Sequence, residues 1–189
     1  MNNTYFLLRH GQTIYQTEKL DEIYPWPDSP PVTLTKDGEE MIKAAAHQLK
    51  KENINLIFAS DTHRVKQSAE IVEKELGIKS ELDRRLRDSN FGSYNGGTIS
   101  EFNNKFDSPK KRFLERSENG ECRKDVKERV EGFLEEVEKK YENKNILIIS
   151  HGDPLLMLEG IIKGLKTDEE FIEFTTGKDI QNVGELRRL

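Results

Sequence analysis

The sequence predicts a three-layer α/β/α fold in which helices cover both faces of a largely parallel central sheet. Two observations carry this prediction. Short apolar runs alternate along the chain with longer segments whose apolar residues recur every three or four positions, which is the pattern of strands and amphipathic helices in turn. The runs 5–8 and 146–149 are apolar at every position, as expected of strands that are buried on both faces of a parallel sheet.

Length and composition favour a single domain over residues 1–189. Hydrophobic and charged residues each make up 34% of the chain, and the apolar ones are grouped in periodic blocks, which argues against disorder. The net charge of -5 argues against general binding to nucleic acid or to an anionic membrane surface. Cys122 is the only cysteine, which excludes an intramolecular disulfide and a cysteine-rich metal site. No stretch is as long as a membrane span, so we expect a cytoplasmic protein.

The first half of the chain contains three predicted strands and two predicted helices. The opening strand, 5–8, ends in Arg9, His10 and Gly11, and residues 14–34 hold four of the six prolines, which is typical of a long ordered loop. Thr35 caps a helix that runs to about Lys51. The elements that follow are a strand at 54–59, a helix that begins after Ser60, Asp61 and Thr62 and stops at Gly77, and a strand at 78–82.

The second half begins with a turn-rich segment, 86–97, and a polar stretch, 98–122, with short helical turns around its phenylalanines. Apolar residues at spacings of three and four make 126–141 the clearest helix of the chain. The strand 146–149 ends in Ser150, His151 and Gly152. The remaining elements are an apolar helix at 155–165, a capping box at 167–170 and an edge strand within 178–189.

Notable side chains follow three of the predicted strands. Arg9 and His10 follow the first, the segment 60–64 with Ser60 and Arg64 follows the second, and His151 follows 146–149. Parallel strands end at one edge of a sheet, so these groups should meet in one crevice. Two arginines and two histidines suit a phosphoryl group, because guanidinium groups donate to phosphate oxygens and neutral imidazole can attack phosphorus. A metal site is disfavoured, because arginines repel a divalent cation and no acidic cluster accompanies them.

Motifs spread over most of the chain carry a family resemblance. They are LLRHGQT at 7–13, LTKDG at 34–38, IFASDTHRVKQSAEIV at 57–72, LRDSNFGSYNG at 86–96, NGECRKDVKERV at 119–130, IISHGD at 148–153 and the tail around Asn182. Together, in this order and in this strand and helix context, they resemble the histidine phosphatase superfamily with its phosphoglycerate-mutase-like fold.

The resemblance implies a role for each matched residue. His10 is the nucleophile that is transiently phosphorylated, Arg9, Arg64 and His151 bind the phosphoryl oxygens, and Asp88 stands at the position of the proton donor. His10 must attack as the neutral imidazole, so its other ring nitrogen should donate to a backbone carbonyl. No cofactor and no metal are implied, since arginines supply the positive charge. Further substrate contacts are expected from Gln16, Ser60, Asn90 and Gly152.

The chain departs from the family pattern at several positions. Asp88 stands where close relatives usually have Glu, and its reach is about 1.5 Å shorter. A misplacement of about 1 Å can cost ~100-fold in rate, so the shorter side chain matters for catalysis. Either the loop sits closer, or the enzyme is slow, or another group helps. Asn90 replaces a common Asp and Gln16 a common Asn. Asp153 and Pro154 replace a glycine-rich continuation, and we interpret them as a helix N-cap followed by proline at the first helical position.

Other residues have plain structural interpretations beside functional ones. His47 and His63 are expected on helix surfaces, and Cys122 is expected to be structural. The polar insertion at about 98–122 contains a basic stretch, Lys110, Lys111, Arg112 and Arg116. A charge run usually marks a solvated face; the functional interpretation is that the insertion covers the active site and attracts anionic substrates. Core packing and pocket lining are equally open for three aromatic residues, Trp26, Phe91 and Tyr94.

Three functions fit the residues. The first is a phosphomonoester phosphatase acting on a small phosphorylated substrate, with removal of phosphate from protein phosphohistidine as a variant; the compact chain favours this hydrolase. The second is a phosphoglycerate mutase that needs a bisphosphate primer. The third is a binding or regulatory protein that has lost good catalysis, which Asp88 and Gln16 suggest. The sequence gives no indication of oligomeric state.

Overall fold

A five-stranded mixed sheet lies at the centre of the computed structural model, which describes residues 1–176 and 180–189. Its strands are β1 (Thr4–Arg9), β2 (Leu56–Ala59), β3 (Ser80–Leu82), β4 (Asn145–Ser150) and β5 (Leu186–Arg188), in the order β3-β2-β4-β1-β5. The pairs β2–β3, β2–β4 and β1–β4 are parallel, and β5 is antiparallel to β1. The prediction of a largely parallel sheet is confirmed.

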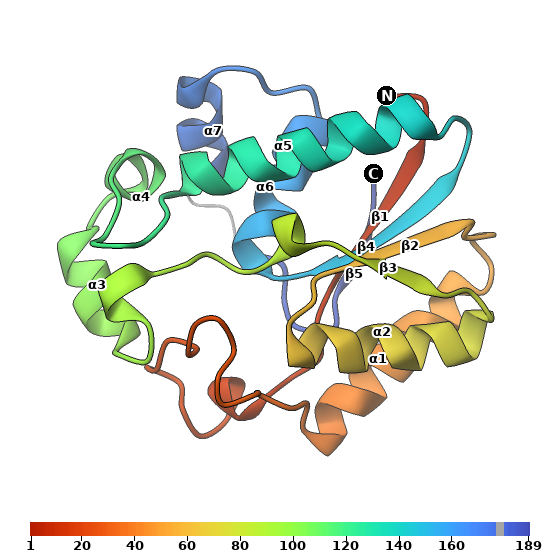
Figure 1. The fold of residues 1–189 in the computed structure, drawn as a ribbon, viewed down its shortest axis with the longest axis horizontal. Coiled ribbons are helices and arrows are strands. Elements are labelled where there is room, and N and C mark those ends of the chain that lie inside the picture. The colour runs from red at the N-terminus through yellow and green to blue at the C-terminus, as the bar shows by residue number, and fades with distance from the viewer. Residues whose placement is uncertain (177–179) are drawn as a thin grey trace.

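Helices cover both faces of this sheet, which confirms the three layers (Figure 1). Helices α1 (Lys36–Leu49) and α2 (His63–Leu76) pack on one face, and α5 (Arg123–Lys140), α6 (Gly152–Ile162) and α7 (Asp168–Thr175) cover the other. Side chains of β1 alternate between the two cores: Tyr5 and Leu7 face α5 and α6, whereas Phe6 and Leu8 face α1 and α2. Both sets are buried, which explains why the strand is apolar at every position.

The polar segment 98–122 contains two short helices, α3 (Ile99–Lys105) and α4 (Pro109–Leu114), which lie beyond the end of the sheet (Figure 1). Three aromatic side chains, Phe91, Tyr94 and Phe106, contact the ring of Phe102 on α3. Single 3-10 turns occur at η1 (Ile14–Gln16), η2 (Arg84–Leu86) and η3 (Gly92–Tyr94). In the part of the chain that the structure describes, no helix is long and apolar enough to cross a membrane.

Element boundaries differ from expectation at a few places. Helix α1 ends at Leu49 and β2 begins at Leu56, because Asn53 takes a left-handed backbone conformation between them. Helix α6 begins at Gly152 rather than Leu155, with His151 as its N-cap residue, so Asp153 is not the cap that the sequence suggested. The tail supplies an edge strand at Leu186–Arg188, although residues 178 and 179 of the expected range lie outside the described residues.

Two glycines allow the start of α1 to pack against the segment that follows β1. A Cβ atom on Gly38 would lie 2.2 Å from the carbonyl oxygen of Gln12, and one on Gly11 would lie 2.4 Å from the carbonyl oxygen of Gly38. Both contacts are with backbone, which cannot move aside easily. This close approach fixes the position of the chain directly after His10.

Replacing Gly38 by alanine should therefore destabilise the protein. We expect Gly38→Ala to lower the free energy of unfolding by about 1–3 kcal/mol, the usual cost of overpacking. Urea denaturation measures the effect. Gly132→Ala in α5 is the matched control, since a Cβ atom there meets nothing within 4 Å and alanine favours the helix. Equal stabilities of Gly38→Ala and wild type would contradict the packing argument.

Candidate active site

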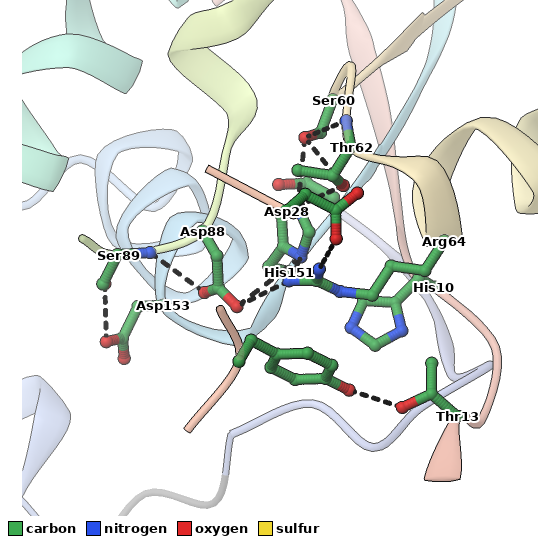
Figure 2. A network of polar contacts seen from close by, with 12 residues as sticks. His10, Thr13, Asp28, Ser60, Thr62, Arg64, Asp88, Ser89, His151 and Asp153 are labelled. Carbon is green, nitrogen blue, oxygen red and sulfur yellow. Dashed lines mark hydrogen bonds and ion pairs between the residues drawn. The ribbon is translucent and has the colours of Figure 1, made fainter. Parts of the chain in front are cut away.

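The register of the parallel strands brings the ends of three strands together. Arg9 of β1 is paired with Ser150 of β4, and the amide of His10 donates to the carbonyl oxygen of Ser150 at 3.1 Å. The amide of Ser60 donates to the carbonyl oxygen of Ile149 at 3.1 Å. His10, Ser60 and His151 thus leave the sheet at one edge, as predicted from the parallel strands, and their side chains meet there (Figure 2).

His10 is completely buried and held in one tautomer. Its Nδ1 lies 2.8 Å from the carbonyl oxygen of Gly11, so Nδ1 carries the proton and the expected backbone acceptor is that of Gly11. Burial and the nearby charges of Arg64 and Arg9 hold the pKa of His10 well below its ordinary value. Among the described residues Nε2 has no hydrogen-bond partner. The imidazole is neutral, with the lone pair of Nε2 free.

Arg64 lies at the second position of α2 and is 2% exposed. Its Nη1 is 3.2 Å from Asp28 Oδ1, and its Nη2 is 3.2 Å from Asp88 Oδ2. The guanidinium also lies over the ring of Tyr24, with 3.9 Å from Cζ to the ring centroid. A buried guanidinium needs such partners, because an unpaired charge in this position would be costly.

His151 faces both Arg64 and the end of β2. Its Nδ1 is 3.1 Å from Arg64 Nη2, and since arginine only donates, Nδ1 must accept. The proton therefore sits on Nε2, which lies 3.0 Å from Ser60 Oγ and 3.2 Å from Thr62 Oγ1. Burial, Arg64 and His10 keep the pKa of His151 well below its ordinary value. Ser60 thus holds the second histidine rather than facing the cavity described below.

Asp88 reaches both the guanidinium group of Arg64 and the imidazole of His151 despite its short side chain. Its Oδ2 lies 3.2 Å from Arg64 Nη2 and 3.6 Å from His151 Nδ1 (Figure 2). Burial raises the pKa of the Asp88 carboxyl, and the charge of Asp153 adds to this, although Arg64 and Arg9 act in the opposite direction. Of the three explanations that the sequence left open, the geometry supports a loop that sits close.

Arg9 is oriented by the C-terminal tail. Its Nη1 donates to the carbonyl oxygen of Gln181 at 2.8 Å, and the Gln181 amide in turn donates to the carbonyl oxygen of Leu7 at 2.9 Å. Sequence reasoning pointed to Asn182 in this tail, one residue away. It also missed Asp28 and Tyr24, whose only signal was their place in the proline-rich loop.

A cavity of about 270 Å³ opens beside these residues. Arg9, Asp88 and Gly152 line it, and the insertion contributes Ile99, Phe102, Asn103 and Arg112. Further apolar walls come from Ile23, Phe91 and Ile180. The lining is therefore mixed: charged side chains come both from the strand ends and loops of the site, such as Arg9 and Asp88, and from the insertion, such as Arg112 and Glu121.

The structure separates the remaining candidates. Gln16 lines the cavity, but its amide is bonded to Thr13 and Tyr24. Asn90 does not line it, and its side chain instead binds Gly92, Asn95 and Asn119 within its own region.

The structure also shows the positions of four residues for which the sequence favoured a structural role. His47 is exposed, as predicted, and His63 is half-buried, with its backbone amide bonded to Asp28. Cys122 is buried at the start of α5, which agrees with a structural role. Asp153 lines the cavity and binds Arg123 and Ser89. Within residues 1–176 and 180–189, no group of three or more His, Cys, Asp or Glu side chains could hold a metal ion.

The site places a neutral buried histidine beside two arginines and a second histidine, at the carboxyl edge of the parallel strands. This arrangement is typical of proteins that transfer phosphoryl groups through a histidine side chain. The chain belongs to the histidine phosphatase superfamily (branch 1), whose family model matches residues 5–175. The resemblance deduced from the motifs is thereby confirmed.

Relatives and solved structures agree with this assignment. The probable phosphoglycerate mutases GpmB of Erwinia tasmaniensis and Escherichia coli are each 29% identical to the chain, over 87% and 85% of its length and 77% and 74% of theirs. A mycobacterial glucosyl-3-phosphoglycerate phosphatase has the same fold, with a TM-score of 0.82 at 20% identity over 98% of this chain and 88% of that one. The α-ribazole phosphatase of Shigella flexneri gives 0.77 at 20% identity, over 98% and 89%. The family and its curated relatives support an enzyme of the phosphatase or mutase kind, and the solved structures support the fold.

The state of His10 can be tested by nuclear magnetic resonance. We expect the imidazole of His10 to remain neutral, with the proton on Nδ1, at pH 5.5–6, because its pKa lies well below the ordinary value of about 6.5. Nitrogen-15 spectra of the histidine rings check this, with the His10→Gln spectrum used for assignment. A doubly protonated His10 ring at pH 6 would refute the electrostatic description.

Proposed function

We propose that the chain is a phosphomonoester phosphatase that works through a phosphohistidine intermediate on His10. The carrying observation is the buried, neutral imidazole of His10, whose Nδ1 is fixed by Gly11 and whose Nε2 has no partner among the described residues. Such a nitrogen is a nucleophile that needs no base.

In the first step Nε2 of His10 attacks phosphorus, and the bond between phosphorus and the leaving oxygen breaks. Arg9 and Arg64 donate to the equatorial oxygens, whose charge they stabilise in the transition state. His151 joins them when its Nε2 proton exchanges the hydrogen bond to Ser60 for one to a phosphoryl oxygen. Asp88, whose pKa is raised by burial, gives a proton to the leaving oxygen.

In the second step the Asp88 carboxylate takes a proton from water, and the water oxygen attacks the phosphoryl group on His10. The bond between Nε2 and phosphorus breaks, which returns neutral His10, protonated Asp88 and free phosphate. The positive charge that this chemistry needs comes from guanidinium groups of this chain, Arg9 and Arg64.

The apolar part of the cavity lining favours a phosphatase over a mutase. A mutase must hold its small polar product and return the phosphoryl group to it. Here the leaving group would enter a space whose lining includes Ile99, Phe102, Phe91, Ile23 and Ile180 beside charged side chains such as Arg112 and Arg123, which suits an organic group that has an apolar or aromatic body as well as polar substituents. The phosphoglycerate mutase alternative is supported by the names of the curated relatives, and it is an outcome of the test below.

Trapping the intermediate tests the proposed reaction. After rapid acid-free denaturation during turnover of a phosphate ester, we expect phosphate on His10 by mass spectrometry. His10→Ala should release at least about 100-fold less phosphate, since it removes the nucleophile. Phosphate transfer to 3-phosphoglycerate that depends on a bisphosphate primer, without net hydrolysis, would instead support the mutase. Phosphate trapped on another residue would refute the mechanism.

The apolar walls generate a second test, on the leaving group. We expect kcat/KM for naphthyl phosphate to fall about 10-fold in Phe102→Ala, because a ring contact in a pocket contributes roughly 1–3 kcal/mol. Ethyl phosphate is the internal control, since its leaving group is too small to reach α3, and its kcat/KM should stay the same. Equal losses for both esters would place the leaving group elsewhere.

A further inference from the structure

We infer that Asp153 is a positioning residue that holds Asp88 in the site through Ser89 and so offsets the short reach of Asp88. The inference rests on the proposed role of Asp88 as proton donor. It links two departures from the family pattern that lie 65 positions apart in the chain, Asp88 for Glu and Asp153 for Gly.

The carboxylate of Asp153 joins three separate elements. Asp153 is the second residue of α6, directly after the helix start at Gly152. Its Oδ2 accepts a hydrogen bond of 2.9 Å from Ser89 Oγ (Figure 2), and its Oδ1 is 3.1 Å from Nε and 3.0 Å from Nη2 of Arg123, the first residue of α5. The side chains of Arg123 and Asp153 are 10% and 14% exposed, so this pair is largely shielded from solvent.

A capping role does not explain these contacts. The N-cap residue of α6 is His151, and the oxygens of Asp153 are directed to Ser89 and Arg123. An acidic residue in the first turn of a helix interacts favourably with the helix dipole, but that interaction needs no serine from another loop. The geometry instead ties the loop of Ser89 to the helix that begins beside His151.

The tie acts on Asp88 because Ser89 is its neighbour. The amide of Ser89 donates to Asp88 Oδ1 at 3.0 Å, and Arg129 Nη2 donates to the carbonyl oxygen of Asp88 at 2.9 Å. Arg129 fixes the loop to α5, whereas Asp153 fixes it to α6 and so to His151. Asp88 Oδ2 then stands 3.6 Å from His151 Nδ1, close enough for a short side chain to serve the site.

The negative charge of Asp153 also favours the proton-donor role of Asp88, because it raises the pKa of that carboxyl group. Burial favours the neutral form of Asp153, but Arg123 and Ser89 outweigh it and lower the pKa, so Asp153 is ionised. Its charge raises the pKa of Asp88 beyond the effect of burial, against the cations Arg64 and Arg9. His151, which also faces Asp88, is neutral. Removal of the Asp153 charge should therefore lower the pKa of Asp88 and move the alkaline limb of the kcat/KM profile for an alkyl ester to lower pH.

Leaving-group dependence separates this role from general damage. A proton donor matters for an alkyl phosphate and matters little for p-nitrophenyl phosphate, whose leaving group departs as a stable anion. We expect Asp153→Asn and Ser89→Ala to reduce kcat/KM for an alkyl ester about 10-fold to 100-fold, and kcat/KM for p-nitrophenyl phosphate less than about 3-fold, because kcat/KM reports the first step and not the later hydrolysis of phospho-His10. Asp125→Asn is the matched control, because Asp125 also pairs with an arginine and is 17% exposed, but does not line the cavity.

Rescue of Asp153→Asn by a longer side chain at position 88 is the decisive test of the positioning role. In the Asp153→Asn background, Asp88→Glu restores the extra methylene and should recover at least about 10-fold in kcat/KM for the alkyl ester. Circular dichroism of every variant confirms folding. Equal losses for both esters, or no rescue by Asp88→Glu, would show that Asp153 has only a structural role.

Wild type and His10→Ala belong in the same assay. Absence of phosphate release that depends on His10 would overturn the proposed function, and this inference with it. Activity that depends on His10 but is unchanged in Asp153→Asn would overturn the inference alone.

Discussion

A buried guanidinium, that of Arg64, sets the arrangement of the site. A charge that is removed from water needs charged or polar partners, and Arg64 finds them in parts of the chain that are distant in sequence. Asp28 comes from the proline-rich loop, Asp88 from the segment after β3, and His151 from the end of β4. The contacts that satisfy the charge therefore assemble three segments around His10, the residue that follows β1.

The same charges determine the chemical state of the histidines. Arg64 and Arg9 oppose any further positive charge, so His10 and His151 stay neutral. The two rings lie beside each other, with 5.3 Å between their centroids, and this closeness also disfavours a charge on His151. The hydrogen bonds then distinguish the two rings. His10 carries its proton on Nδ1 toward Gly11, and His151 carries its proton on Nε2 toward Ser60. One ring is left as a nucleophile, and the other is held by the arginine.

Carboxylates balance these cations in two distinct ways. Asp28 neutralises Arg64 from the side of the loop, with little exposure of either group. Asp153 neutralises Arg123 at the start of α5 and at the same time binds Ser89. Asp88 stands between these pairs, and burial keeps its proton bound more tightly than in water. The cavity lining thus combines the cation of Arg9 with the carboxyl group of Asp88, while the insertion supplies the apolar Ile99 and Phe102 together with Arg112.

The sequence by itself determined the layers of the fold and the centre of the site. Apolar runs and helical periodicity reflect local burial, so they predicted the parallel strands and the helices that cover them, and the strand ends predicted that Arg9, His10, Arg64 and His151 would meet. Other contacts were decided only by the tertiary structure. Asp28, Gln181 and Asp153 act through partners 36, 172 and 64 positions away, and no local pattern encodes such pairings. Asp153 illustrates the reason: a carboxylate at a helix start satisfies a capping pattern locally, but Arg123 and Ser89, brought near by packing, bind it more strongly than an exposed helix end would.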